Sequence, residues 1–130
     1  MARALALVEA LARRLRPHAP GGIAVQAEAG GVAIFKPGSP QVWSVVTTPD
    51  ILDDPEDDRS AQEKIKVATY SVLDHFQDFI AEELAEPWPE TGSQMALPKV
   101  EVGNEQVRMW FELGHDRVLE LEPIPLAELE

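Results

Sequence analysis

Cysteine is absent from this 130-residue chain. Disulfide bonds, thiolate metal ligands, iron–sulfur clusters and a cysteine nucleophile are therefore excluded. The longest apolar runs also fall far short of the roughly 18 residues that a membrane-spanning helix needs, so we expect no membrane association. Arginine outnumbers lysine and alanine is abundant, as in proteins from GC-rich genomes. We expect a bacterial, cytoplasmic protein.

Positive charge is also scarce. The chain has 11 lysine and arginine residues against 23 aspartate and glutamate residues, a net charge of −12. Such a chain is repelled by nucleic acid and by anionic lipid, so we expect no nucleic-acid partner. The acidic surface either keeps the protein in solution or docks a basic partner, with mimicry of DNA as a special case.

Sequence motifs for phosphate and metal chemistry are missing or incomplete. Neither G-x-x-x-x-G-K-[ST] nor G-x-G-x-x-G occurs. The acidic loop 49–58 has carboxylates suited to Ca²⁺ or Mg²⁺, but Pro55 stands in its middle where an EF-hand loop needs a glycine. The alternative is negative charge placed before a helix N-terminus, which the helix dipole favours. We expect no metal site and no cofactor.

Two helices are predicted from apolar residues at helical spacing. The first covers 2–16 and ends before Pro17. The second begins at Ser60, which forms a capping box with Glu63, and extends to about residue 86. Its predicted buried stripe consists of Ile65, Ala68, Thr69, Val72, Leu73, Phe76, Phe79 and Ile80, whereas Asp74, Gln77, Asp78 and Glu82 lie outside it. The stripe of the first helix consists of Leu5, Val8, Ala12 and Leu15, widened by Leu7 and Leu11.

Three strands are predicted after each helix. In the first half, a turn at Gly30-Gly31 would pair Ala29 with Val32 and Ala27 with Ile34, and 42–46 forms a third strand. In the second half, a two-residue turn at Gly103-Asn104 follows Val100 and Val102. A three-residue loop at 114–116 would set Leu119 opposite Phe111 and Leu121 opposite Met109.

The element order is therefore αβββαβββ, and the fold class is α+β. We expect one domain over 1–130, with two helices packed on one face of a mainly antiparallel sheet. This order resembles that of small acidic secretion-chaperone-like domains, which are α+β homodimers. The resemblance is one of topology and implies a protein-interaction role and self-association.

Four residues are candidates for a binding site. On the second helix, His75 and Asp78 form one polar strip with Ser71 and Glu82, although parallel side chains from one helix converge poorly on a substrate. Trp88 lies in the long connection 87–98, a kind of loop that is often functional. Trp110 alternates with Met109 and Phe111, so it should point away from the core.

These observations favour a non-catalytic, acidic protein-interaction or chaperone-like accessory domain that forms a homodimer and could bind another protein. Its contact surface would carry Trp110, enlarged by Phe35 and Val45. The alternative is a small-molecule-binding protein or minor enzyme, with a pocket between the long helix and the sheet that includes His75, Asp78 and Trp88. No catalytic set is recognisable, so we expect no enzyme.

Overall fold

The computed structural model describes residues 2–28, 31–38, 42–45, 56, 58–89 and 94–129, with the backbone alone for 2–4 and 42–45. The elements are α1 (Ala2–Leu15), η1 (Arg16–His18), β1 (Ala24–Glu28), β2 (Gly31–Phe35), β3 (Val42–Val45), α3 (Ala61–Leu84), β4 (Leu97–Val102), β5 (Gln106–Leu113), β6 (Asp116–Glu120), β7 (Ile124–Pro125) and η2 (Leu126–Leu129). The α+β class and the order αβββαβββ are confirmed, with β7 added near the end.

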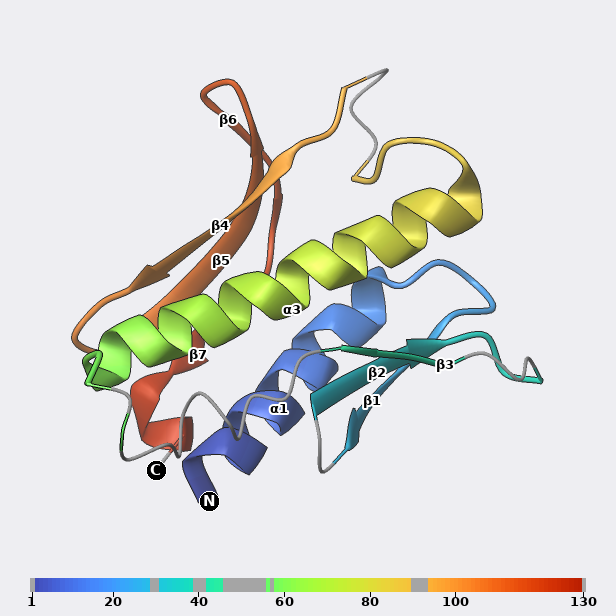
Figure 1. Ribbon diagram of the computed structural model, residues 1–130. Helices are drawn as coiled ribbons and strands as arrows, with labels where there is room; N and C mark the ends of the chain where they lie inside the picture. Colours follow the sequence, from blue (N-terminus) through green and yellow to red (C-terminus); the bar gives the residue numbers. More distant parts are fainter. Residues whose placement is uncertain are drawn as a thin grey trace.

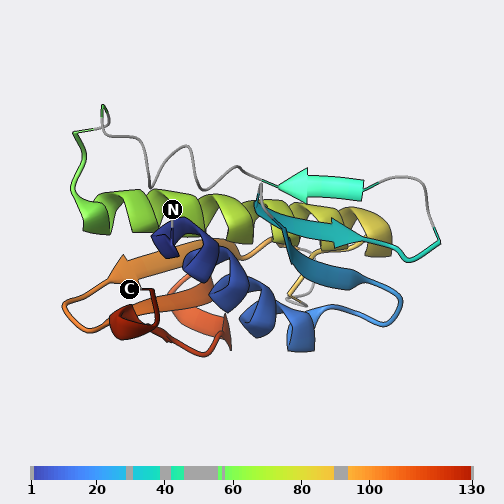
Figure 2. The same ribbon diagram turned by 90° about the horizontal axis from the view of Figure 1, so that it is seen from below.

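The strands form two antiparallel sheets instead of the one expected. The first has the order β1-β2-β3; the second has the order β4-β5-β6, with β7 also paired to β5. Helix α3 runs through the middle, with the second sheet on one side and α1 with the first sheet on the other (Figures 1 and 2). It contacts β4 as well as β2 and β3, so it is shared by both sheets.

Helix α3 follows the predicted pattern closely. The Ser60 hydroxyl accepts a hydrogen bond from the Glu63 backbone N–H at 3.1 Å, which caps the first turn. All eight residues of the predicted stripe are buried. The helix ends where Ala85 adopts a left-handed conformation with φ 55°, two residues before Pro87.

Two side chains on the helices lie differently from the prediction. Leu5 of α1 is 49% exposed, because about 100° per residue places it nearly opposite the buried Leu7. Gln77 of α3 was placed outside the stripe but is only 3% exposed. Its amide donates hydrogen bonds to the backbone oxygens of Trp88 at 3.1 Å and Ala96 at 2.5 Å. Those bonds satisfy the polar group that burial would otherwise leave unpaired.

The register of the first hairpin differs from the prediction by two residues. Ala27 pairs with Val32 and Val25 with Ile34, so the turn at Gly30-Gly31 was wrong. Side chains alternate with a period of two, so a shift of two keeps every residue on its expected face. Val25, Val32 and Ile34 are accordingly buried.

The β4–β5 turn is likewise longer than the two residues predicted. Val102 pairs with Val107, and the Gly103 N–H donates to the Gln106 carbonyl at 3.0 Å. Strand β4 also begins earlier than expected, at Leu97, and includes Pro98. A proline is tolerated there because β4 is an edge strand.

The predicted pairing at the β5–β6 turn is confirmed, though by another route. Leu119 pairs with Phe111, and the Leu121 N–H donates to the Met109 carbonyl at 3.0 Å. The predicted three-residue loop 114–116 was wrong, because Asp116 pairs with Leu113 and the loop contains only Gly114 and His115. A register shift next to Phe111 accommodates the extra residue within the pairing.

One hydrophobic core joins both halves of the chain. Buried residues from α1, β1, β2, α3, β4, β5 and the C-terminal segment belong to one cluster. The C-terminal segment is attached to α1 by Arg14, which is 8% exposed. Its guanidinium donates to the backbone oxygens of Glu122 and Pro123 at 3.0–3.2 Å and to the Glu128 carboxylate at 3.2 Å.

Among the described residues, neither helix combines the length and the hydropathy that a membrane-spanning segment needs.

Candidate functional site

The outer face of the second sheet is the surface that turns away from α3 and the core. On β5 the residues alternate: Val107, Met109 and Phe111 are buried, whereas Arg108 is exposed and Trp110 is partly exposed. The expected direction of Trp110 is thus confirmed. The strand pairings place seven further residues on this side, and together they define the Trp110 face: Leu97, Lys99, Glu101, Arg108, Trp110, Glu112, Arg117 and Glu120.

Trp110 lies at the centre of this face, between Lys99 of β4 and Glu120 of β6. Its indole Nε1–H donates to the Glu112 carboxylate at 3.1 Å, and the Arg117 guanidinium lies 4.0 Å from the ring centroid. These contacts hold the ring in one orientation. Leu97, at one corner of the face, is 57% exposed, the highest value among the exposed large apolar side chains described.

The charges on this face are balanced, unlike those of the whole chain. It carries three basic residues, Lys99, Arg108 and Arg117, and three acidic residues, Glu101, Glu112 and Glu120. The chain as a whole has a net charge of −12. Two copies of this face can therefore approach each other with far less repulsion than the net charge of the whole chain implies.

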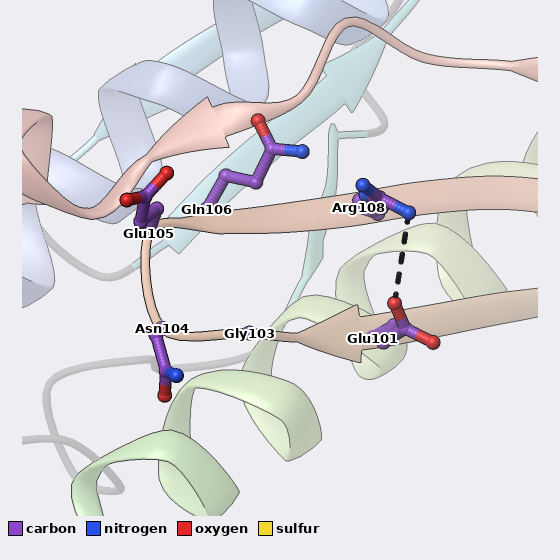
Figure 3. A pocket seen from close by; sticks show the side chains of 6 residues that line it. All are labelled: Glu101, Gly103, Asn104, Glu105, Gln106 and Arg108. Atoms are coloured by element: carbon purple, nitrogen blue, oxygen red, sulfur yellow. Dashed lines mark ion pairs between the residues drawn. The ribbon is translucent and has the colours of Figure 1, made fainter.

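Two of the shallow hollows in the described part of the chain lie next to β4, at the border of the Trp110 face. One, of about 390 Å³, lies at the β4–β5 turn and is lined by Glu101, Gly103, Asn104, Glu105, Gln106 and Arg108. Figure 3 shows Glu101 and Arg108 side by side on neighbouring strands, with an ion pair of 3.9 Å between them. The other, of about 450 Å³, lies between the first turns of α3 and β4, and Lys66, Lys99 and Trp110 contribute to its wall. Both linings include charged side chains, and that of the second hollow also includes Val100 and Val102.

Trp88 is part of the core side of the molecule. Its ring packs edge-to-face against Phe76 of α3 at 5.3 Å and against Phe111 of β5 at 5.4 Å. The described part of the 87–98 connection thus packs near α3, with Ala96 also buried. Trp88 and Ala96 therefore lie on the core side of the second sheet, away from the Trp110 face.

His75 and Asp78 are both exposed on α3. The His75 Nδ1–H donates to the Ser71 carbonyl at 2.8 Å, one turn earlier in the same helix. Neither residue lines the hollow beside Trp110, and Trp88 faces the core. The structure therefore does not bring the four sequence candidates into one site.

Two expectations fall partly or wholly on residues that the structure does not describe. Most of the acidic loop 49–58 and the side chain of Val45 lie outside the described residues. Phe35 belongs to β2 of the first sheet, on the other side of α3, so it does not enlarge the Trp110 face. Within the described residues, no three His, Asp or Glu side chains lie close enough to hold a metal ion.

Strand alternation places Arg108 and Glu112 on the same side as Trp110. Sequence reasoning missed the residues that β4 and β6 contribute to the Trp110 face. The cross-strand neighbours Lys99 and Glu120 depend on the registers, and the registers at two of the three predicted turns were wrong.

Comparisons with known proteins give no relative. No protein-family model matches the chain, and no curated protein or solved structure matches it.

Proposed function

We propose that this protein is a non-catalytic protein-interaction domain, of the chaperone-like accessory kind, that acts as a homodimer in the bacterial cytoplasm. The contact surface is the Trp110 face. The carrying observation is an indole fixed at the centre of an open sheet face by Glu112 and Arg117, on a face whose charges balance.

Several physical arguments support this surface. Tryptophan and arginine are enriched among the residues that dominate binding energy at interfaces, and they concentrate near the centre of the contact. Trp110 has two arginines on its own face, Arg108 and Arg117. The exposed Leu97 adds apolar area at one corner. Two-fold pairing is the commonest form of association for such a surface.

The alternative, a small-molecule site between α3 and the sheet, has less support. The hollow there is open and borders the Trp110 face, and its lining includes neither His75 nor Asp78. Small-molecule sites instead bury most of their ligand in an enclosed, largely apolar cavity.

Sedimentation velocity tests the proposal. We expect the wild-type protein to associate to a dimer between roughly micromolar and millimolar concentration, the range of modest interfaces. Trp110→Glu should weaken association by about 2 kcal/mol or more, roughly thirtyfold, because it removes the central ring and adds a negative charge.

The matched control is Tyr70→Glu, which replaces a 43% exposed aromatic residue on α3, outside this face. It should leave association unchanged. Circular dichroism and melting curves establish that both variants are folded. A wild-type monomer over the whole concentration range, or equal effects of both substitutions, would refute the proposed homodimer.

A further inference from the structure

The charges of the Trp110 face form a grid, fixed by the registers of β4, β5 and β6, with one extra residue in β6 between Arg117 and Glu120. Its middle row is Lys99, Trp110 and Glu120, in the strand order β4, β5, β6. The row on one side is Glu101 and Arg108, and the row on the other side is Leu97, Glu112 and Arg117. Each base has an acid at the position reached by reflection across the diagonal through Leu97 and Trp110.

This symmetry has a consequence for two copies packed face to face. A two-fold axis between them lies parallel to the sheets, so it can run along the strands, across them, or along either diagonal. The Leu97–Trp110 diagonal puts Lys99 opposite the second copy's Glu112, Arg108 opposite its Glu120, and Arg117 opposite its Glu101. Leu97 and Trp110 lie on the axis and meet their own counterparts, apolar against apolar.

The other three directions bring like charges together. An axis along the strands sets Arg108 and Glu112 each against its own counterpart. An axis across the strands does the same to Lys99 and Glu120. The second diagonal opposes Lys99 to Arg108 and Glu112 to Glu120. Like charges in direct contact cost several kcal/mol at an interface, so these arrangements are disfavoured.

We infer that the partner of the Trp110 face is a second copy of this chain, docked about the Leu97–Trp110 diagonal with the strands of the two sheets crossed at roughly 70°. This arrangement rests on the proposed homodimer and specifies its geometry. A crossing of this size is closer to the orthogonal mode of sheet packing than to the aligned mode. Strands lie about 4.8 Å apart and residues on one face about 6.8 Å apart along a strand, so the diagonal lies about 35° from the strands and opposed positions differ by about 3 Å. Lysine, arginine and glutamate side chains readily span that difference.

Docking requires the charges to exchange partners. In the single chain Arg108 lies 3.9 Å from Glu101, and Arg117 lies 3.5 Å from Glu120. In the dimer, Arg108 would pair with Glu120 of the second copy, and Arg117 would pair with its Glu101. Exposed ion pairs contribute little, so this exchange costs little, and the contact of Arg117 with the Trp110 ring is similarly modest.

The size of the face sets the strength of association. At these spacings the grid covers about 300 Å² per copy, well below the roughly 800 Å² per partner of a standard interface. The hollow beside α3, with Ser60, Gln62 and Lys66, adjoins the grid and can extend the contact. We therefore expect weak association that falls with added salt, because exposed charges are screened.

A charge-swap cycle tests the arrangement. Lys99→Glu and Glu112→Lys, each alone, should weaken association about tenfold or more, since each opposes like charges twice per dimer. The double variant K99E/E112K restores opposite charges across the axis and should associate within about threefold of wild type. The control K99E/E120K also replaces one lysine by glutamate and one glutamate by lysine. It restores opposite charges only for an axis along the strands, so its association should remain weak.

Glu112→Lys also removes the hydrogen bond to Trp110, so a second cycle uses Arg108→Glu and Glu120→Arg with the same expected rescue. Failure of both double variants to recover association, or recovery by K99E/E120K instead, overturns the diagonal arrangement. If Trp110→Glu abolishes the dimer but neither double variant restores association, the proposed homodimer is supported and only the diagonal arrangement is refuted. A wild-type protein that is monomeric refutes both proposals.

Discussion

Replacing Phe76 is the sharpest test of how α3 packs. Its side chain is fully buried in the helix that both sheets share, and its ring meets Trp88 at 5.3 Å and 78°. Trp88 in turn meets Phe111 of β5 at 5.4 Å, so three rings connect α3, the 87–98 connection and the second sheet. Removing the Phe76 ring opens a cavity at the end of this stack.

Phe76→Ala should cost about 3–5 kcal/mol, the usual range for a buried phenylalanine. Domains are stable by only about 5–15 kcal/mol, so a large share of the stability would be lost. At about 4 °C per kcal/mol for a chain of this size, the melting temperature should fall by about 12–20 °C. Thermal unfolding followed by circular dichroism measures this shift, and urea titration gives the free energy directly.

Tyr70→Ala is the control on the same helix, because Tyr70 is 43% exposed and should cost about 0.5 kcal/mol or less. A double-mutant cycle of Phe76→Ala with Trp88→Ala should show a coupling of about 0.5–1.5 kcal/mol for the edge-to-face pair. A Phe76→Ala protein that melts within a degree or two of wild type would mean that the buried face of α3 has been assigned wrongly.

Two further predictions concern the C-terminal segment and metal ions. Arg14→Met should destabilise the protein by at least about 2 kcal/mol, because it leaves the backbone carbonyls of Glu122 and Pro123 without their donor. Arg13→Met should change stability by less than about 0.5 kcal/mol, because its contact with Glu128 is exposed. Equal effects of the two substitutions in urea titration would contradict this. The Arg13 side chain is 59% exposed and that of Arg14 only 7%. EDTA and excess Ca²⁺ should both leave the melting temperature unchanged, because we expect no metal site. Binding would be easy to detect, since a ligand at a hundred times its dissociation constant stabilises the folded state by about 2.7 kcal/mol. A clear rise of the melting temperature with Ca²⁺ would indicate a site at Asp53–Asp58.

The sequence was sufficient to predict which face each element buries. The eight-residue stripe of α3 and the alternation of Met109, Trp110 and Phe111 are periodic, and periodicity reports the direction of a side chain relative to the core. Leu5 was misplaced because it lies at the end of α1, where the stripe has few residues to define its centre. Gln77 was misplaced because its burial depends on two carbonyl partners from a distant connection, which no local pattern indicates.

Strand register and sheet membership were harder to predict. Apolar alternation distinguishes shifts of one residue but not of two, so the pairing of Ala27 was missed while its face was correct. Each strand offers one apolar face to a helix, and this holds equally for one sheet or for two sheets that share α3. The grid around Trp110 depends on these registers, so its charge symmetry became visible only in the structure.

The central claim is that Trp110 lies at a contact between two copies of this chain. Amide and indole NMR spectra recorded over a series of protein concentrations test it most directly, because Trp88 is an internal control packed against Phe76 and Phe111. We expect the Trp110 indole Nε1–H resonance to shift with concentration, together with amides of β4, β5 and β6, while the Trp88 indole resonance stays constant. Resonances that do not move with concentration, or shifts confined to the first sheet, would contradict it.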